Sequence, residues 1–548
     1  MTKPNGGALA LVFAGVFAVL AGLSLLKGGV FISEHEGDTI HLLQIVLRMA
    51  AGDMAHIDFV TPIGMFAFAP IALFASFGLG AGMSFILGQA LVAALALPAI
   101  WWVAASRYRG AWAYVFGVVT LGLILALIAG ETTRAVSVSM HYNRWAWAAA
   151  FLAISTAVLP SYERQSRVAD GLVIGLALAC MALIKITFFV AFLPAIAVAL
   201  LARKSWRTIL VGLIAGLLVA GIVTLFAGGT TFWLHYLANL ANVAASDVRP
   251  KPSLPFEAVI GAPAYIVGSL VALLGVVLLR QSGRAVEGLA LLLLVPAFFY
   301  VTYQNSGNDP QWLMLLALML MVLRPAREIY NGLGWELHKG LTYAAIAGFV
   351  LISGSAINLI YSPIRNYTQD TEKYVQLVPG SQRVRGVYTS RARAMRVDLR
   401  WAEDEASSVY GAHVDSELRT DVTEFMGERL PQCAIDKGLV AVYASLADDL
   451  KANGLVEGKS IFAADLLNAS WLYGASEPLK HGSPWYYGGL PGYRFADYLL
   501  VPLCAQSTFV RKLVLGAVSA HVEAGKSNLT EAYRNAQYVL YEVQFPAQ

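Results

Sequence analysis

The sequence predicts a polytopic α-helical membrane protein with a smaller α/β domain at its C-terminal end. The 548 residues are 57% hydrophobic and only 14% charged, whereas a soluble protein carries roughly a quarter charged residues. Apolar runs of about 16 to 23 residues, long enough to cross a bilayer as helices, recur up to about residue 360. Beyond residue 361 charged residues become common. No patch of basic and aromatic residues indicates a nucleic-acid partner.

The first apolar run, residues 8–30, is expected to be a retained membrane helix. It is too long for the core of a signal peptide, and no small-residue cleavage site precedes Glu34. The short N-terminus carries Lys3, so we predict that it lies in the cytoplasm.

The basic connectors orient the remaining helices, because basic loops prefer the cytoplasm. If residues 62–77 crossed the membrane, most basic connectors would fall outside. If that segment is interfacial or re-entrant, every one of them falls inside, and we predict this arrangement. The connectors are 107–109, 164–167, 203–207, 280–284 and 324–327.

These criteria give about eleven spans. The apolar run from 172 to 201 is too long for one upright helix, and we predict a break near Lys185, where a charge and two β-branched residues interrupt it. The expected spans are 8–30, 82–104, 112–130, 145–160, 170–187, 188–202, 209–227, 257–279, 285–303, 311–323 and 340–360.

The part after residue 361 reads as alternating strands and helices, which is typical of an α/β domain. An odd number of crossings puts this domain outside the cytoplasm. Cys433 and Cys504 both lie in it, and either pair as a disulfide or remain free thiols. The expected strands are 438–443, 460–464, 498–502 and 537–544, and the expected helices are 445–453 and 509–524.

The first outer loop gathers an unusual number of ionisable residues for so apolar a chain. Such a group at a membrane surface suggests proton transfer or cation binding. Residues 39–49 have the spacing of an amphipathic helix lying on the membrane. Asp38 lies near its start, where capping is the alternative to catalysis. The loop contains Glu34, His35, Glu36, Asp38, Asp53, His56 and Asp58.

Three cations in the outer half of the bundle are candidates for binding phosphate. Arg134 and Arg144 lie on the side that basic residues avoid, which is tolerated when an anion pairs with them. Lys185 interrupts an apolar run, so it either binds a ligand or extends its ammonium to the interface. Further candidate substrate contacts in these loops are His56, His141, Tyr142, Asn143, Asn308 and Asp309.

Three further features have a structural and a functional interpretation. Asp309 is also a candidate cap for the next helix, with Pro310 at its first position. In the C-terminal domain, Asp465 follows a predicted strand, a common place for a site residue. Trp485 belongs to a cluster of Trp and Tyr that either stacks on an acceptor sugar or packs the domain against the membrane.

Carboxylates, phosphate-binding cations, aromatic rings and grooves between helices are what a lipid-phosphate-linked sugar requires. The chain resembles the C-type, polyprenyl-phosphate-dependent glycosyltransferases (GT-C), which include protein O-mannosyltransferases and aminoarabinose transferases. The resemblance covers residues 8–160 at motif level. It rests on His35-Glu36-Gly37-Asp38 through Arg48, on Gly52-Asp53, and on Asp58-Phe59-Val60-Thr61-Pro62-Ile63-Gly64.

The chain also departs from the family pattern. Gly37-Asp38 replaces a pair of adjacent acids, and Thr61-Pro62 replaces a pair of prolines. The second outer loop reads Tyr142-Asn143-Arg144, where relatives often carry another Asp. These departures leave the donor and any metal requirement open.

The resemblance implies sugar transfer from a polyprenyl-phosphate donor to a glycan, lipid or protein hydroxyl, with inversion at the anomeric carbon. The site would face the outside of a bacterial cytoplasmic membrane. Asp38 would be the base, aided by Glu36 or Asp58. Arg134, Arg144 or Lys185 would stabilise the leaving phosphate. No cofactor is certain, and a divalent cation held by Asp38 and Asp58 is an option.

Two other functions fit parts of the sequence. A transporter or flippase for a lipid-linked glycan would share the spans and the cations, but needs its polar groups mainly at the bilayer midplane. A scaffold within an envelope-assembly complex would explain the outer domain and leave the acidic first loop unexplained.

Overall fold

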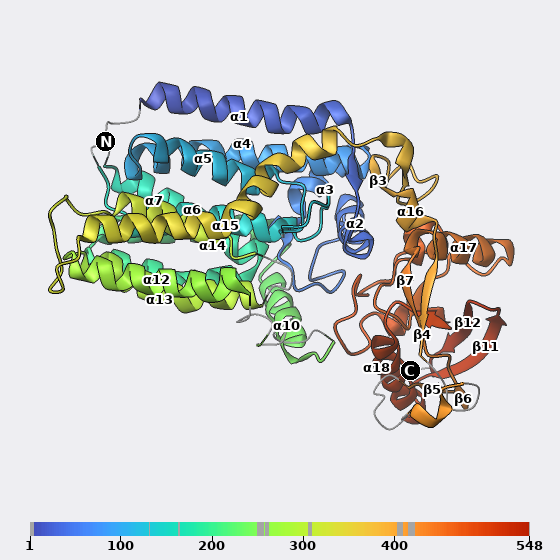
Figure 1. The fold of residues 1–548 in the computed structure, drawn as a ribbon. Coiled ribbons are helices and arrows are strands. Elements are labelled where there is room, and N and C mark those ends of the chain that lie inside the picture. Colours follow the sequence, from blue (N-terminus) through green and yellow to red (C-terminus); the bar gives the residue numbers. More distant parts are fainter. Residues whose placement is uncertain are drawn as a thin grey trace.

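A computed structural model describes residues 5–130, 132–162, 165–248, 257, 262–304, 309–402, 409–414 and 422–546. A long helical bundle is joined at one end to a smaller domain that contains the strands (Figure 1). We call this end of the bundle the domain end and the opposite one the far end. Asn308, a predicted site residue, lies outside the described residues.

Helices occupy all eleven predicted positions. Among the described helices, seven are long and apolar enough to cross a membrane, and α5, α8 and α14 are apolar but shorter. The polytopic helical class is therefore supported, while the number of crossings is not fixed. The helices are α1 (Gly6–Lys27), α4 (Ala81–Arg107), α5 (Ala111–Leu125), α6 (His141–Val158), α7 (Arg167–Ile184), α8 (Ile186–Ala202), α9 (Trp206–Phe226), α12 (Pro263–Gln281), α13 (Ala285–Tyr303), α14 (Trp312–Val322) and α15 (Leu337–Tyr367).

The described basic connectors meet at the far end of the bundle. Arg203, after α8, donates to the carbonyl of Ala157 at 2.8 Å and pairs with Glu287 at 2.7 Å. Arg107, at the end of α4, pairs with Asp170 at 2.7 Å. These contacts join the ends of α4, α6 and α8 to the starts of α7 and α13, as the charge pattern requires.

Residues 62–77 do not form a membrane-length helix. They contain a 3-10 turn, η1 (Met65–Ala67), and the eight-residue helix α3 (Ala69–Ser76). Eight residues rise only about 12 Å, against a hydrocarbon core of about 30 Å.

The predicted break separates α7 from α8 at Lys185. The Lys185 backbone is extended, with φ −156° and ψ 105°. The N–H of Gly64 donates to the Ile184 carbonyl at 3.0 Å, so a chain segment from the first loop contacts the opened end of α7. A Cβ on Gly64 would lie 2.0 Å from the Leu183 carbonyl oxygen, and only glycine fits there.

One further helix, α10 (Thr231–Ala245), was not predicted. Its buried residues Phe232, Tyr236 and Asn239 face the domain end of the bundle. The Tyr236 hydroxyl donates to the Ala182 carbonyl of α7 at 2.7 Å. In the sequence, His235 and Asn239 interrupt the apolar residues of this segment. It therefore contains no continuous apolar run long enough to predict a membrane helix.

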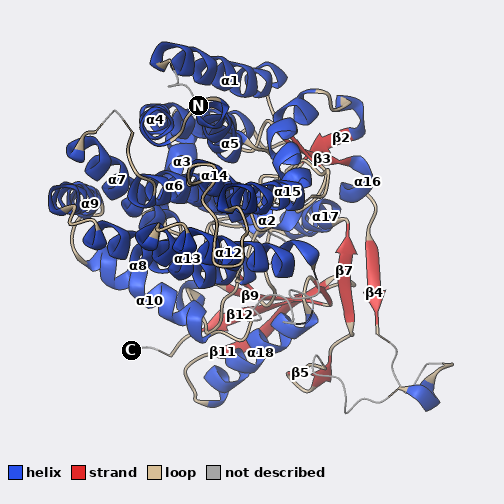
Figure 2. Cartoon of the chain, turned by 60° about the vertical axis from the view of Figure 1, so that its left-hand side comes forward, coloured by secondary structure: helices blue, strands red, loops and turns tan. Residues whose placement is uncertain are grey.

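Within the described residues, the strands of the C-terminal domain belong to four small sheets (Figure 2). The first has order β1-β3-β2 and includes β1 from the first loop, so that loop and the domain share one sheet. The others run β10-β7-β4, β11-β12-β9-β8 and β5-β6. The strands are β1 (Val30–Ile32), β2 (Tyr374–Gln376), β3 (Val387–Ser390), β4 (Asp398–Trp401), β5 (Glu424–Phe425), β6 (Glu428–Arg429), β7 (Cys433–Lys437), β8 (Ile461–Ala463), β9 (Tyr498–Pro502), β10 (Cys504–Ala505), β11 (Asn528–Arg534) and β12 (Tyr538–Gln544).

The helices of this domain are α16 (Arg391–Ala394), α17 (Leu439–Ala452) and α18 (Thr508–Glu523). The predicted strand at 438–443 is wrong, because Gly438 ends β7 in a left-handed conformation and α17 follows. Val440, Tyr443 and Ala447 are buried at helical spacing, which outweighs the β-branched character of the run.

Cys433 and Cys504 form a disulfide, the first of the two alternatives left open by the sequence. The two residues are direct partners in the parallel pair β7–β10. The bond therefore joins two strands that are 71 residues apart in sequence.

Candidate functional site

The amphipathic segment of the first loop forms α2 (Glu36–Ala50), but it does not lie on an open surface. One face, with Leu43 and Val46, contacts Ile71 of α3 and Phe85 of α4 around a small apolar cavity. On another face, the Gln44 side chain donates to the Pro484 carbonyl at 3.1 Å and accepts from the Trp471 indole at 3.2 Å. The helix is thus held between the bundle and the C-terminal domain, as Figure 1 shows.

Asp38 lies in the first turn of α2 and is half-buried. Its carboxylate accepts a hydrogen bond from the Ser139 hydroxyl at 2.5 Å. The capping alternative is wrong, since His35 is the N-cap residue and makes no capping bond with its side chain. A carboxylate in the first turn is nevertheless stabilised by the helix dipole.

Glu36, two residues earlier, is committed to an ion pair. Its two oxygens accept from Arg393 Nε at 2.6 Å and Nη2 at 3.0 Å, and Thr389 adds a third bond at 3.0 Å. Burial raises the pKa of this carboxyl, but the hydrogen bonds and charge of Arg393 outweigh burial and lower the pKa below 4.5. The pair ties α2 to the C-terminal domain.

We expect Glu36→Gln to lower the free energy of unfolding by about 1–2 kcal/mol, since Arg393 is partly exposed and the pair is partly screened. A carboxyl with a lowered folded-state pKa stabilises the fold above its unfolded pKa. The difference should therefore vanish as the pH falls below 4.5 and Glu36 gains a proton. Thermal unfolding of the purified protein across this pH range measures it, with the exposed Glu457→Gln as control. An equal loss at low pH would contradict the assignment.

Asp58 lies at the other end of α2. Its carboxylate accepts from the Met54 N–H at 2.6 Å, and its carbonyl accepts from Arg48 at 3.0 Å. Because α2 separates Asp58 from Asp38, a divalent cation shared by these two carboxylates does not fit the structure. No three His, Cys, Asp or Glu side chains gather as a metal site within the described residues.

Arg144, on α6, is fully buried and holds the second loop, residues 126–140. Its guanidinium donates to the carbonyls of Ala126 at 3.1 Å, Ser139 at 3.2 Å and Ile128. Arg134 on the same loop is exposed. These carbonyls occupy the guanidinium of Arg144, which therefore holds the loop in place.

Lys185 contacts the start of α6. Its ammonium donates to the Asn143 side-chain oxygen at 3.0 Å and lies 5.5 Å from the centre of the Tyr142 ring. The loop residue Ser139, which binds Asp38, lies two residues before the start of α6. Residues 139–143 therefore connect Asp38 to Lys185, and we call these residues together the Asp38–Lys185 site.

The histidines predicted as substrate contacts are held by the backbone. His141 contacts the Ala67 carbonyl at 2.7 Å. His56 donates from Nδ1 to the Thr61 carbonyl at 3.0 Å, and its ring lies 4.5 Å from the ring of Tyr236. Burial lowers the pKa of His56 to about 4, so it is neutral at pH 7.

The remaining candidates also make internal contacts. Asp309 accepts from the Ser355 hydroxyl, and the N-cap residue of α14 is Gln311, so the predicted cap is wrong. The buried Asp465 accepts from three backbone N–H groups; burial raises its pKa to about 6 against their opposing effect. The Trp485 ring lies 5.5 Å from that of His41, in the interface with α2.

No family model, curated protein or solved structure matches this chain.

Two residues central to this arrangement were not identified from the sequence. Ser139 is an ordinary serine in an apolar loop, and Arg393 is one of several arginines after residue 380. Only their long-range partners, Asp38 and Glu36, distinguish them. For Ser139 the one available signal was its position two residues before the His141-Tyr142-Asn143 sequence.

Proposed function

We propose that this protein is a membrane glycosyltransferase of the GT-C kind, which moves a sugar from a polyprenyl phosphate to an acceptor hydroxyl. The observation that supports it best is the Asp38–Lys185 site. A half-buried carboxylate and a half-buried ammonium are held at the domain end of the bundle through residues 139–143. One offers a base and the other a phosphate-binding charge.

In the proposed reaction, the acceptor hydroxyl attacks the anomeric carbon and transfers its proton to the Asp38 carboxylate. The bond between that carbon and the phosphate oxygen breaks, and the polyprenyl phosphate leaves with the bonding electrons. Lys185 stabilises the charge that develops on the phosphate. Ser139 positions Asp38 through its hydrogen bond.

The charge distribution supports a site on the outer side of a bacterial cytoplasmic membrane. The basic connectors meet at the far end, which is expected to face the cytoplasm. The domain end, with the Asp38–Lys185 site, would then face outward. The disulfide in the C-terminal domain agrees with an oxidising compartment.

The test uses the purified protein in nanodiscs with a radiolabelled polyprenyl-phosphate sugar and candidate glycan, lipid and protein acceptors. We expect release of free polyprenyl phosphate together with labelled acceptor. The same protein is reconstituted in vesicles to detect movement of intact donor across the bilayer. Donor movement without any transfer would contradict the proposal and support a flippase.

We expect Lys185→Met to lower kcat/KM for the donor by about tenfold to a hundredfold, because it removes the charge opposite the phosphate. Lys185→Arg should recover part of this loss. The control is Lys204→Met, which removes an exposed lysine at the far end. Unchanged donor kinetics in Lys185→Met would remove this residue from the phosphate site.

A further inference from the structure

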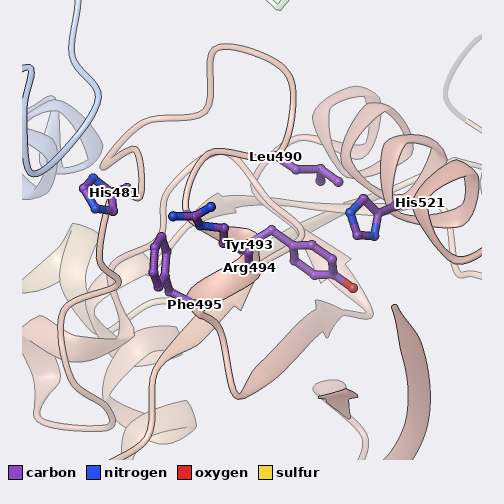
Figure 3. Close-up of a pocket in the computed structure, with 7 residues that line it drawn as sticks. His481, Leu490, Tyr493, Arg494, Phe495 and His521 are labelled. Carbon is purple, nitrogen blue, oxygen red and sulfur yellow. The ribbon is translucent and has the colours of Figure 1, made fainter. Parts of the chain in front are cut away.

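The C-terminal domain also contains a cavity that is separate from the Asp38–Lys185 site. This cavity of about 410 Å³ opens between residues 481–495 and α18. Figure 3 shows Arg494 and His481 over Phe495 on one side of this cavity, and Tyr493 with His521 on the other. We call it the Arg494 pocket.

Arg494 is the most available charge in the pocket. Its guanidinium carbon lies 4.5 Å from the centre of the Phe495 ring, and the His481 ring lies 5.1 Å from the same ring. Arg494 is exposed, and no hydrogen bond or ion pair with another described residue occupies it. A guanidinium supported by an aromatic ring presents its N–H groups to a carboxylate or phosphate.

Among the described lining residues, the guanidinium of Arg494 is the permanent charge, and it favours an anion. The described lining contains one arginine and two histidines but no aspartate or glutamate. On the opposite side, the half-buried His521 ring lies 5.5 Å from the ring of the fully buried Tyr493, at nearly a right angle. The partly exposed rings of Phe495 and His521, beside Arg494, suit a sugar that also carries an acidic group.

The wall of the pocket is fixed to the first loop. The His481 N–H donates to the Asp58 carbonyl at 2.9 Å, and the Gly482 carbonyl accepts from the Val60 N–H at 3.0 Å. Arg48, in the last turn of α2, donates to the Leu479 carbonyl at 3.0 Å. The pocket is therefore anchored to the C-terminal end of the helix that carries Asp38 at its start.

The length of α2 sets the size of a ligand that reaches both sites. Ten residues separate Asp38 from Arg48 on this helix, which corresponds to about 15 Å along its axis. One sugar unit cannot occupy the Arg494 pocket and also present its hydroxyl to Asp38. Only a chain of several sugar units is long enough to span that distance.

We propose that the Arg494 pocket binds an acidic sugar unit of an oligosaccharide acceptor, while another unit of that chain meets Asp38. This inference rests on the proposed function, because it names the acceptor class of that reaction. It favours a glycan acceptor that carries carboxylate or phosphate groups over a neutral glycan or a protein.

Binding of hexagalacturonate to the full-length protein in nanodiscs tests the inference. The neutral methyl ester of this hexasaccharide has the same sugar chain without the carboxylate charges, so it shows whether the charge is needed. Hexaglutamate represents an acidic peptide. We expect the wild type to bind the acid at least tenfold more tightly than the ester or the peptide. Arg494→Gln should weaken binding about tenfold, whereas Arg400→Gln, an exposed arginine of β4 outside the pocket, should not.

Each result of these binding measurements either supports the inference or overturns it. Equal affinity of Arg494→Gln and wild type, equal binding of acid and ester, or no binding of the acid would overturn the inference. Preference for hexaglutamate would replace the saccharide with an acidic peptide. Binding of hexagalacturonate is measured without any sugar transfer, so the two results are independent. A protein that transfers sugar but does not bind hexagalacturonate would overturn only the inference about the pocket. Acid binding with no transfer to any acceptor overturns only the proposed function.

Discussion

Asp38→Asn is expected to reduce kcat for sugar transfer by about 10²- to 10⁴-fold, the usual contribution of a general base. The asparagine side-chain oxygen still accepts the hydrogen bond from Ser139, so the local geometry is retained. An amide cannot take the proton of the acceptor hydroxyl, and the loss should therefore appear in kcat while donor binding stays near the wild-type value.

Two measurements on purified Asp38→Asn check this result: single-turnover transfer of the labelled sugar, and equilibrium binding of the donor. The matched control is Glu34→Gln, which removes a neighbouring half-buried carboxylate of the same loop. Ser139→Ala should give a smaller loss, with an altered pH–rate profile, because this residue positions Asp38. Full activity of Asp38→Asn would remove Asp38 from the mechanism.

Gly64→Ala is expected to cost about 1–3 kcal/mol of stability, as overpacking does elsewhere, and to lower donor affinity as well. The added Cβ would meet the Leu183 carbonyl oxygen at 2.0 Å, so either the first loop or the end of α7 has to move. Both shifts disturb the break at Lys185, since the Gly64 N–H donates to the Ile184 carbonyl.

Thermal unfolding in detergent and donor binding together measure the effect of Gly64→Ala. Gly15→Ala is the matched control, because a Cβ there meets nothing within 4 Å. Alanine is also the better helix former at this position of α1, so the control should be neutral or slightly stabilising. A Gly64→Ala protein as stable as the control would show that the loop does not depend on this close approach.

Predictions from the sequence succeeded where a residue's own neighbours along the chain decide the outcome. The cost of leaving backbone groups unpaired in lipid makes each long apolar run a helix, and a described helix occupies each of the eleven predicted positions. The charge and β-branching at Lys185 located the break between α7 and α8. Strand β9 was predicted at its observed bounds, Tyr498–Pro502.

Predictions failed where packing overrides local preference. The β-branched residues after Gly438 favour a strand, yet burial at helical spacing makes α17. The amphipathic stripe of α2 suggested a helix on a membrane surface, yet its other faces are covered by the C-terminal domain. An acidic residue before an apolar run resembled a helix cap at both Asp38 and Asp309, and neither caps its helix.

The sequence by itself therefore determined the polytopic helical class and the positions of eleven of the described helices, because hydrophobicity and charge act through local composition. Only the tertiary structure decided what each acid of the first loop does. Glu36 meets Arg393 across 357 residues, and Asp38 meets Ser139 across 101. The first contact forms only when the first loop meets the C-terminal domain, and the second only when two loops of the bundle come together, which places Asp38 on the Lys185 side of the bundle.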